Sequence, residues 1–345
     1  MTTARADGPA NRTTGDPTAG TASLIASLQG HIDRVLLPLL EQWPSVVLLD
    51  YPAHENVGDS AIWLGTLALL RRAGVRVTYS CSIDTYSRAE LARRRRGGVI
   101  LIHGGGSFGD LWERPQRFRE QVITDFPDAP IVQLPQTIHF EREEALARAR
   151  AVLDAHPNLT LLARDEASLR FARKHFRAAS HLCPDLAFSL GALARPVTPR
   201  QPLVWLARND REAAPRNLPA DVTPVDWIDA RPDLAGRVDG WLRMQSAQRP
   251  RVRPALTGSL MRTANWAART RLQRGLRLLA SGRAVVTDRL HAHILSLLAG
   301  IPHVLLDNSY GKVSGFYDSW TRGAPLVQWA DSAGHAQRLA RELVQ

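Results

Sequence analysis

Short, uninterrupted apolar runs alternate with segments of helical periodicity along most of the chain. In the first half, the runs predict strands at Ser45–Leu49, Val75–Tyr79, Val99–Ile102, Ile131–Leu134, Leu159–Ala163 and His181–Cys183. Between them, apolar residues at helical spacing predict helices at Ser23–Leu40, Ser60–Ala73, Arg88–Arg96, Arg114–Phe126, Glu143–Ala155 and Arg164–His175. Buried strands that alternate with helices are typical of a parallel sheet covered on both faces, so the pattern predicts an α/β fold.

A proline-rich segment, Gly191–Pro202, separates this pattern from a second one. Beyond it we expect strands at Leu203–Ala207, Val225–Ile228, Ala284–Val286 and Pro302–Leu306. The expected helices are Arg231–Gln248, Asn265–Ala280, Arg289–Leu298 and Ser332–Val344, with an irregular stretch at Arg249–Leu260. Because 345 residues favour two domains, we predict an N-terminal domain at 23–195 and a C-terminal domain at 196–345. Residues 1–22 lack periodicity and are predicted to form a disordered tail.

The stretch Val285–Gly300 combines a buried strand, a polar turn and an apolar helix. Thr287 and Asp288 are good N-cap residues, which places Arg289 and His291 in the first helical turn. Free N–H groups and the helix dipole favour an anion at this position, beyond the carboxyl end of a parallel strand. The alternative is that Arg289 pairs with Asp288 or another carboxylate and that His291 merely packs.

Four strand ends in the first domain also finish in polar or glycine-rich turns. The strongest is HGGGSFGD, in which Gly104, Gly105 and Gly106 would let the backbone approach a ligand, although a tight turn alone would also need glycine. The other three are Asn56–Asp59, Gln136–His139 and Arg164–Glu166. Taken singly, each has a structural explanation: Asp59 as a helix cap, His139 as a packed histidine, and Arg164 as an exposed helix start.

Together the five turns would place histidines, arginines, glycines and an aspartate around one cleft, since all follow predicted strands. Arginines bind carboxylate and phosphate, and histidines exchange protons near neutral pH. The pattern therefore favours a donor that carries both phosphate and carboxylate.

Seven segments, taken in order, resemble the polysaccharide pyruvyl transferase family. They are NVGDSAIW (Asn56–Trp63), HGGGSFGDLW (His103–Trp112), QLPQTIHF (Gln133–Phe140), ARDEASL (Ala163–Leu169), CPDLAF (Cys183–Phe188), TDRLHAHILSLLAG (Thr287–Gly300) and DNSYGKVSGFYDSW (Asp307–Trp320). The resemblance implies two Rossmann-like domains whose parallel sheets face a cleft, similar to glycosyltransferase-B enzymes. It also implies transfer of the enolpyruvyl group of phosphoenolpyruvate to a saccharide, which yields a pyruvate ketal in cell-surface or exopolysaccharide biosynthesis.

The resemblance also suggests roles for individual residues. The donor-binding candidates are His139, Arg164, Arg289, Leu290 and His291, together with the glycines Gly104, Gly105 and Gly106. The chemistry needs a general acid, either His291 or His139, and a base, either Asp59 or Asp165. The acceptor-binding candidates, which lie in the same motifs, are Asn56, His103 and Lys312. The scheme requires no metal and no cofactor.

The amino-acid composition restricts the kinds of partner that the protein is expected to bind. The net charge is +11, and 42 of the 44 basic residues are arginines. These arginines are scattered without an interleaved aromatic motif, so we expect no nucleic acid and instead anionic substrates or an anionic membrane face. Cys81 and Cys183 form no CxxC pair, and no apolar run reaches the length of a membrane span. We therefore expect a cytoplasmic protein that contacts the inner membrane face.

Two other functions share parts of this pattern. A nucleotide-sugar glycosyltransferase of the same twin-domain fold would also have a glycine-rich turn and a basic cleft. A non-catalytic protein that binds polyanionic glycans would account for the charge alone. The acceptor, whether lipid-linked, polymeric or nucleotide-activated, is open at this point.

Overall fold

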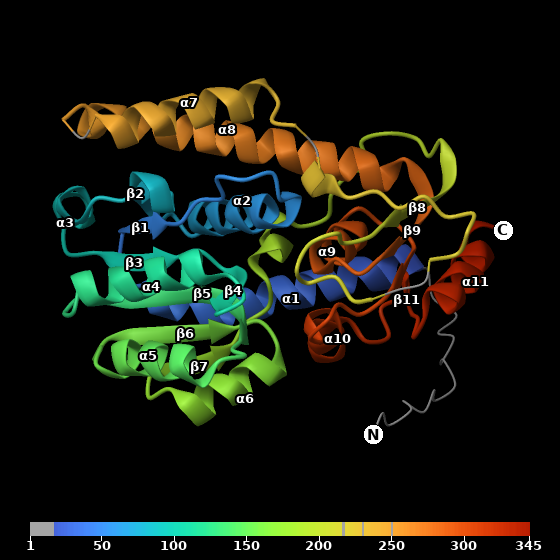
Figure 1. Cartoon of the computed structure of the whole chain (residues 1–345), viewed down its shortest axis with the longest axis horizontal. Helices are drawn as coiled ribbons and strands as arrows, with labels where there is room; N and C mark the ends of the chain where they lie inside the picture. Colours follow the sequence, from blue (N-terminus) through green and yellow to red (C-terminus); the bar gives the residue numbers. More distant parts are fainter. Residues whose placement is uncertain (1–16, 216–217, 230, 250) are drawn as a thin grey trace.

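The computed structural model describes residues 17–215, 218–229, 231–249 and 251–345, and its strands form two parallel sheets (Figure 1). The larger sheet has the order β2-β1-β3-β5-β6-β7, with β4 paired to β5, and the smaller has the order β11-β10-β9-β8. The strands of the larger sheet are β1 (Ser45–Leu49), β2 (Arg76–Cys81), β3 (Val99–Ile102), β4 (Gly105–Gly109), β5 (Ile131–His139), β6 (Leu159–Ala163) and β7 (Ala179–Leu182). Those of the smaller are β8 (Gln201–Leu206), β9 (Gly282–Thr287), β10 (His303–Leu305) and β11 (Val327–Trp329). The predicted α/β class with parallel strands is confirmed.

Helices cover both sheets, as the periodicity predicts. They are α1 (Pro17–Leu40), α2 (Val57–Arg72), α3 (Arg88–Arg95), α4 (Glu113–Asp125), α5 (Glu143–Asp154), α6 (Glu166–His175), α7 (Leu234–Gln248), α8 (Arg253–Ala280), α9 (Leu290–Leu298), α10 (Lys312–Phe316) and α11 (Ala333–Val344). Within the described part of the chain, no helix is long and apolar enough to cross a membrane.

The two faces of each sheet contribute to different apolar cores. In β1, Val46 and Leu48 join the largest core, whereas Val47 and Leu49 join the core on the opposite face. This alternation follows from the period-two geometry of a strand, and an uninterrupted apolar run satisfies both faces at once. The largest core also includes Val285 of β9, so side chains from both sheets meet in one cluster.

The glycine-rich segment after β3 differs from the expected turn. It forms β4, which continues the line of β3 and pairs with the second half of β5, Gly105 opposite Gln136. Consequently β5 runs to His139, five residues beyond its predicted end. The apolar run ends at Leu134, but parallel partners on both sides of β5 keep the polar residues extended.

Several expected boundaries in the second half are wrong. Val225 makes only an isolated bridge to Leu206, and Trp227–Asp229 is a 3₁₀ turn rather than a strand. Helix α8 begins at Arg253, so most of the expected irregular stretch is helical, because α8 packs along α2 and α7. The strand β11 had no predicted counterpart.

The N-terminal prediction is corrected in part. Helix α1 begins at Pro17, so residues 17–22, expected in the disordered tail, are helical, with Thr21 buried. Gly20 lies against Pro325, a contact that the sequence alone does not reveal. Residues 1–16 lie outside the described part of the chain.

Candidate active site

A cavity of about 880 Å³ lies where the carboxyl ends of strands from both sheets meet. Its lining comes from the segments after β1, β2 and β3 in one sheet and after β8 and β9 in the other. Nine predicted site residues line it: Asn56, Asp59, His103, Gly104, Gly106, Arg289, Leu290, His291 and Lys312. This is where parallel α/β sheets bind ligands, because loops and helix N-termini converge there.

His291 lies in the first turn of α9, as predicted, and its ring is largely buried. Its Nε2 lies 3.2 Å from a carboxylate oxygen of Asp185, which fixes the orientation of the ring. Burial alone would raise the pKa of Asp185, but the neighbouring His291 and Arg164 outweigh it and hold that pKa well below its ordinary value. The opposite side of the imidazole packs on Gly58, where any side chain would collide with the ring.

Arg164 is fully buried behind the cavity wall. It donates to Asp185 at 2.8 Å and to Thr137 at 2.9 Å, whereas its Nη2 is buried without a hydrogen-bond partner. That free donor lies beside Gly106, and the side chain of Lys312 reaches the same glycine. A buried, unsatisfied guanidinium nitrogen is costly, so this point is suited to an anionic ligand.

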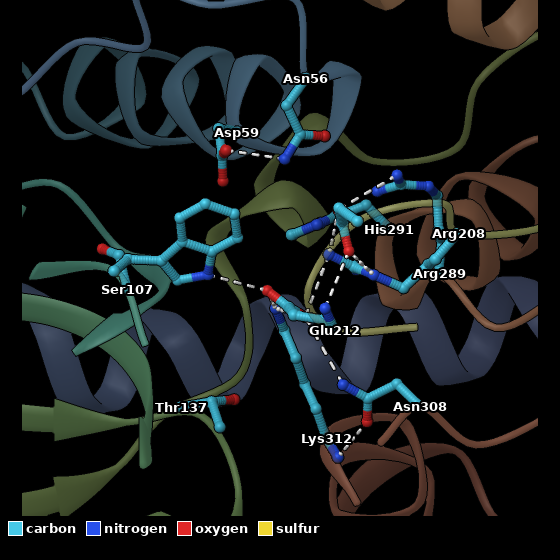
Figure 2. A network of polar contacts seen from close by, with 12 residues as sticks. Asn56, Asp59, Ser107, Thr137, Arg208, Glu212, Arg289, His291, Asn308 and Lys312 are labelled. Carbon is cyan, nitrogen blue, oxygen red and sulfur yellow. Dashed lines mark hydrogen bonds and ion pairs between the residues drawn. The ribbon is translucent and has the colours of Figure 1, made fainter. Parts of the chain in front are cut away.

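Glu212, in the loop after β8, is at the centre of the polar network in Figure 2 and was not predicted from sequence. It accepts hydrogen bonds from Lys312 at 3.0 Å and from the indole of Trp112 at 3.1 Å, and it pairs with Arg208 at 3.1 Å. Burial raises its pKa, but Lys312 and Arg208 lower it to about 2 overall. Burial in turn lowers the pKa of Lys312 to about 8, despite the ion pair. Glu212 thus holds the Lys312 ammonium against β4.

Arg289 occupies the N-cap position of α9, not the first turn, and it is already paired. Its guanidinium contacts Asp226 closely and Asp210 at 3.4 Å, and it lies over the ring of Trp227. The alternative interpretation of Arg289, a partner for a carboxylate, therefore describes this structure. Its buried Nε has no partner.

The predicted caps of α9 have other roles. Thr287 is the last residue of β9, and Asp288 accepts from the backbone N–H of Arg208. The strand continues further than expected, and this moves the helix start by one residue.

Asp59, Asn56 and His103 lie together on one wall of the cavity. Asn56 caps α2 and donates to Asp59 at 2.8 Å. Burial raises the pKa of the Asp59 carboxyl, but the neighbouring His54, His291 and His103 lower it by more than burial raises it. The pKa is therefore below its ordinary value, and the carboxylate is ionised. His103 stays neutral, since burial lowers its pKa to about 4, and both ring nitrogens are buried without partners. A neutral imidazole of this kind can donate or accept a hydrogen bond from a bound hydroxyl.

Three predicted site residues do not line the cavity, besides Arg164. His139 stacks on Tyr310 with ring centres 4.6 Å apart, and its Nε2 faces Glu141. Both carboxylate oxygens of Asp165 are occupied, one by the backbone of Ser168 and one by Thr137. Gly105 has a φ of +130° and lies against Asp59.

Asp50, at the end of β1, is a second lining residue that sequence reasoning missed. Its backbone is left-handed, with φ of 65°, and burial raises the pKa of its carboxyl to about 7. A left-handed backbone at a non-glycine residue often marks a functional site. This conformation cannot be read from the sequence, so no sequence signal pointed to Asp50.

Residues 56–310 match the family model described as polysaccharide pyruvyl transferase. The chain belongs to this family. It is 33% identical to Pyruvyl transferase 1 of Schizosaccharomyces pombe over 295 residues, 81% of this chain and 71% of that protein. It is 29% identical to the putative pyruvyl transferase EpsO of Bacillus subtilis, covering 88% of this chain and 94% of that one.

The fold of this pyruvyl transferase is also found in the crystal structure of an uncharacterised Klebsiella pneumoniae protein. The two share 16% identity with a TM-score of 0.58, over 88% of this chain and 99% of that one. The family assignment makes the protein an enzyme, a polysaccharide pyruvyl transferase, and favours pyruvyl transfer over both alternatives considered above. Over the described ranges, no group of three histidine, cysteine or acidic side chains is arranged to hold a metal ion.

Proposed function

We propose that this pyruvyl transferase takes phosphoenolpyruvate as donor and forms a pyruvate ketal on a saccharide. The observation that supports the donor is the convergence of Lys312 and the unpartnered Nη2 of Arg164 on Gly106. Two cationic groups at one point of a largely buried wall suit a small, multiply charged anion better than an uncharged sugar. Phosphoenolpyruvate, with a phosphate and a carboxylate, is such an anion.

The proposed reaction joins the donor to two hydroxyls of the saccharide and releases phosphate. A proton is added to the methylene carbon of the donor, and a sugar hydroxyl forms a C–O bond to the adjacent carbon. The bond from that carbon to the phosphate oxygen breaks, inorganic phosphate leaves, and a second hydroxyl closes the ketal. Of the two hydroxyl protons, one balances the proton taken up by the methylene and the other leaves with a base or with phosphate.

Of the two candidate acids, we favour His291, because it lines the cavity and is oriented by Asp185, whereas His139 stacks outside it. Of the two candidate bases, we favour Asp59, since it is ionised and lines the cavity. One oxygen of Asp165 caps α6 and the other accepts from Thr137, which suits a positioning role. Arg289, Leu290 and Gly104 would complete the donor wall.

The acceptor would contact Asn56 and His103. The unpartnered nitrogens of His103 support this assignment, because sugar hydroxyls can both donate and accept. Lys312, an acceptor candidate from the sequence, is better suited to the donor by its position at Gly106. We further propose that residues 23–195 and 196–345 are two Rossmann-like domains that face this cavity, and that the enzyme works in the cytoplasm, at the inner face of the membrane.

The direct test is incubation with isotopically labelled phosphoenolpyruvate and a panel of lipid-linked and free galactosides, mannosides and N-acetylhexosamines. Mass spectrometry should detect a labelled ketal, with one phosphate released for each ketal formed. Lys312→Met should weaken donor use, while Lys174→Met is the matched control, because Lys174 is the only other lysine and is exposed on α6. Sugar transfer from a nucleotide donor, with no ketal from any acceptor, would refute the proposal.

A further inference from the structure

The exposed large hydrophobic side chains gather on one part of the molecule. Of the six in the described ranges, five lie between residues 231 and 280, which form helices α7 and α8 and their connection and are called the α7–α8 hairpin here: Leu234, Trp241, Met244, Val252 and Trp266. Leu234 is 64% exposed and Trp241 56%. Scattered exposed apolar residues are normal, but a group on one element indicates a surface that meets a partner.

The same hairpin carries most of the net charge. Residues 231–280 contain eleven arginines, two aspartates and no lysine or glutamate, a net charge of +9 out of the chain's +11. The basic charge was expected to be scattered along the chain. This is wrong for the net charge, because most of the excess of positive over negative residues lies in this hairpin. Asp239 is buried against Arg243, and Asp233 caps α7. Elsewhere in the chain, acidic residues nearly balance the arginines.

Several exposed arginines of the hairpin are available to a partner. Arg237, Arg249 and Arg251 are exposed and have no ion pair to any carboxylate in the described ranges. Because paired arginines would be neutralised, these free ones give the hairpin its attraction for anions.

The hairpin also borders the cavity. Gly236, Arg237 and Gly240 of α7 line it. Trp241 follows Arg237 by one helical turn, and Met244 follows Gly240 by one turn, so these side chains lie next to the lining residues on the helix surface. Figure 1 shows α7 and α8 side by side along one edge of the molecule, above α2. Trp241 and Met244 thus lie beside one rim of the cavity.

We infer that the α7–α8 hairpin docks on an anionic lipid bilayer and delivers a lipid-linked saccharide to the cavity. Trp241 and Met244 would enter the interfacial region, where aromatic and apolar groups are favoured, and the arginines would face anionic headgroups. This inference rests on the proposed function, because it specifies the acceptor of that site. It also accounts for unpaired arginines and exposed apolar side chains on one hairpin.

Two other occupants fit the hairpin less well. A second copy of the chain would bring two surfaces rich in unpaired arginine together, which is repulsive. A soluble anionic polysaccharide would satisfy the arginines and could stack on tryptophan, but it offers nothing to Leu234, Met244 or Val252. A bilayer satisfies both kinds of side chain.

The test is flotation of the full chain with vesicles of phosphatidylcholine alone or with one third phosphatidylglycerol. We expect binding only to the anionic vesicles. Arg249→Gln with Arg251→Gln should weaken binding roughly thirtyfold, because each arginine near an anionic surface contributes about fivefold. Trp241→Ser with Met244→Ser should weaken it about tenfold, as two half-exposed side chains lose apolar burial. The matched control is Arg170→Gln with Arg173→Gln, exposed arginines on α6, which should bind like the unchanged protein.

A second readout separates this inference from the proposed function. With a water-soluble saccharide acceptor, the hairpin variants should retain normal ketal formation, whereas with the lipid-linked acceptor in anionic vesicles they should lose it. Equal binding to both vesicle types, no vesicle binding, or dimerisation abolished by Trp241→Ser would each overturn docking even if the enzyme forms ketals. Tight vesicle binding without any ketal would instead refute the proposed function.

Discussion

Gly106→Ala tests the donor pocket with a single methyl group. The backbone of Gly106 has no positive φ, so alanine is compatible with its conformation. The added Cβ would lie 2.7 Å from Cε of Lys312 and 2.9 Å from Nη2 of Arg164, whereas ordinary contacts begin near 3.4 Å. Arg164 is fully buried and held by Asp185, so Lys312 is the side chain that must move.

The size of the effect follows from what Lys312 loses. Its ammonium lies 3.0 Å and 3.3 Å from the two oxygens of Glu212, and a retreat of about 1 Å breaks at least one of these contacts. The retreat also removes one cation from the donor site. A charge-assisted contact is worth about 1.5–3 kcal/mol, so donor affinity should fall about ten- to hundredfold. The fold should persist, because the terminus of a lysine side chain can move without disturbing the backbone.

The assay is the steady-state KM for phosphoenolpyruvate and kcat with a fixed acceptor, together with the thermal midpoint. The matched control is Gly258→Ala on α8, where a Cβ would meet nothing within 4 Å. A Gly106→Ala enzyme that folds and keeps the KM and kcat of the unchanged protein would show that the donor does not bind at this wall.

Three further predictions concern other residues of the molecule. His291→Gln should retain donor binding and lose turnover by about 10²–10⁴-fold, since glutamine can still donate to Asp185 but delivers no proton; turnover near normal in this variant would exclude His291 as the acid. Arg289→Ala should weaken donor binding about ten- to hundredfold. It should also destabilise the protein by about 3–5 kcal/mol, because it leaves Asp226 buried without its close partner; an unchanged urea midpoint would contradict that ion pair. The buried pair His293 and His303 should make stability fall with acid. Burial lowers the pKa of His303 to about 4 and that of His293 well below 6.5, so both are neutral when folded and take up protons on unfolding. The free energy of unfolding that these two neutral histidines contribute is fully present above about pH 6.5. It decreases by about 1.4 kcal/mol per pH unit for each histidine as the pH falls toward 4. His303→Gln should flatten that slope between pH 6.5 and 5, measured by urea unfolding, and an equally steep slope would count against the pair.

Much of the framework could be predicted from local patterns. The strands β1, β3 and β6 have the predicted bounds, because an apolar run buried on both faces of a parallel sheet is defined by its own residues. Turns at the carboxyl ends of such strands are brought to one edge by topology, which is why Asp59, His103 and His291 line one cavity.

The pairing of charges was decided only by the tertiary structure. Lys312 with Glu212 and His291 with Asp185 join residues 100 and 106 positions apart, and no periodicity links them. For Arg289 the sequence left open an anion or a carboxylate partner, and Asp226 reaches it from a segment that was expected to be a strand. Residue types and strand ends are local properties, whereas the partner of a buried charge depends on which loops the sheets bring together. The sequence by itself therefore determined where the site lies, and only the tertiary structure decided which of its charges are left unpaired.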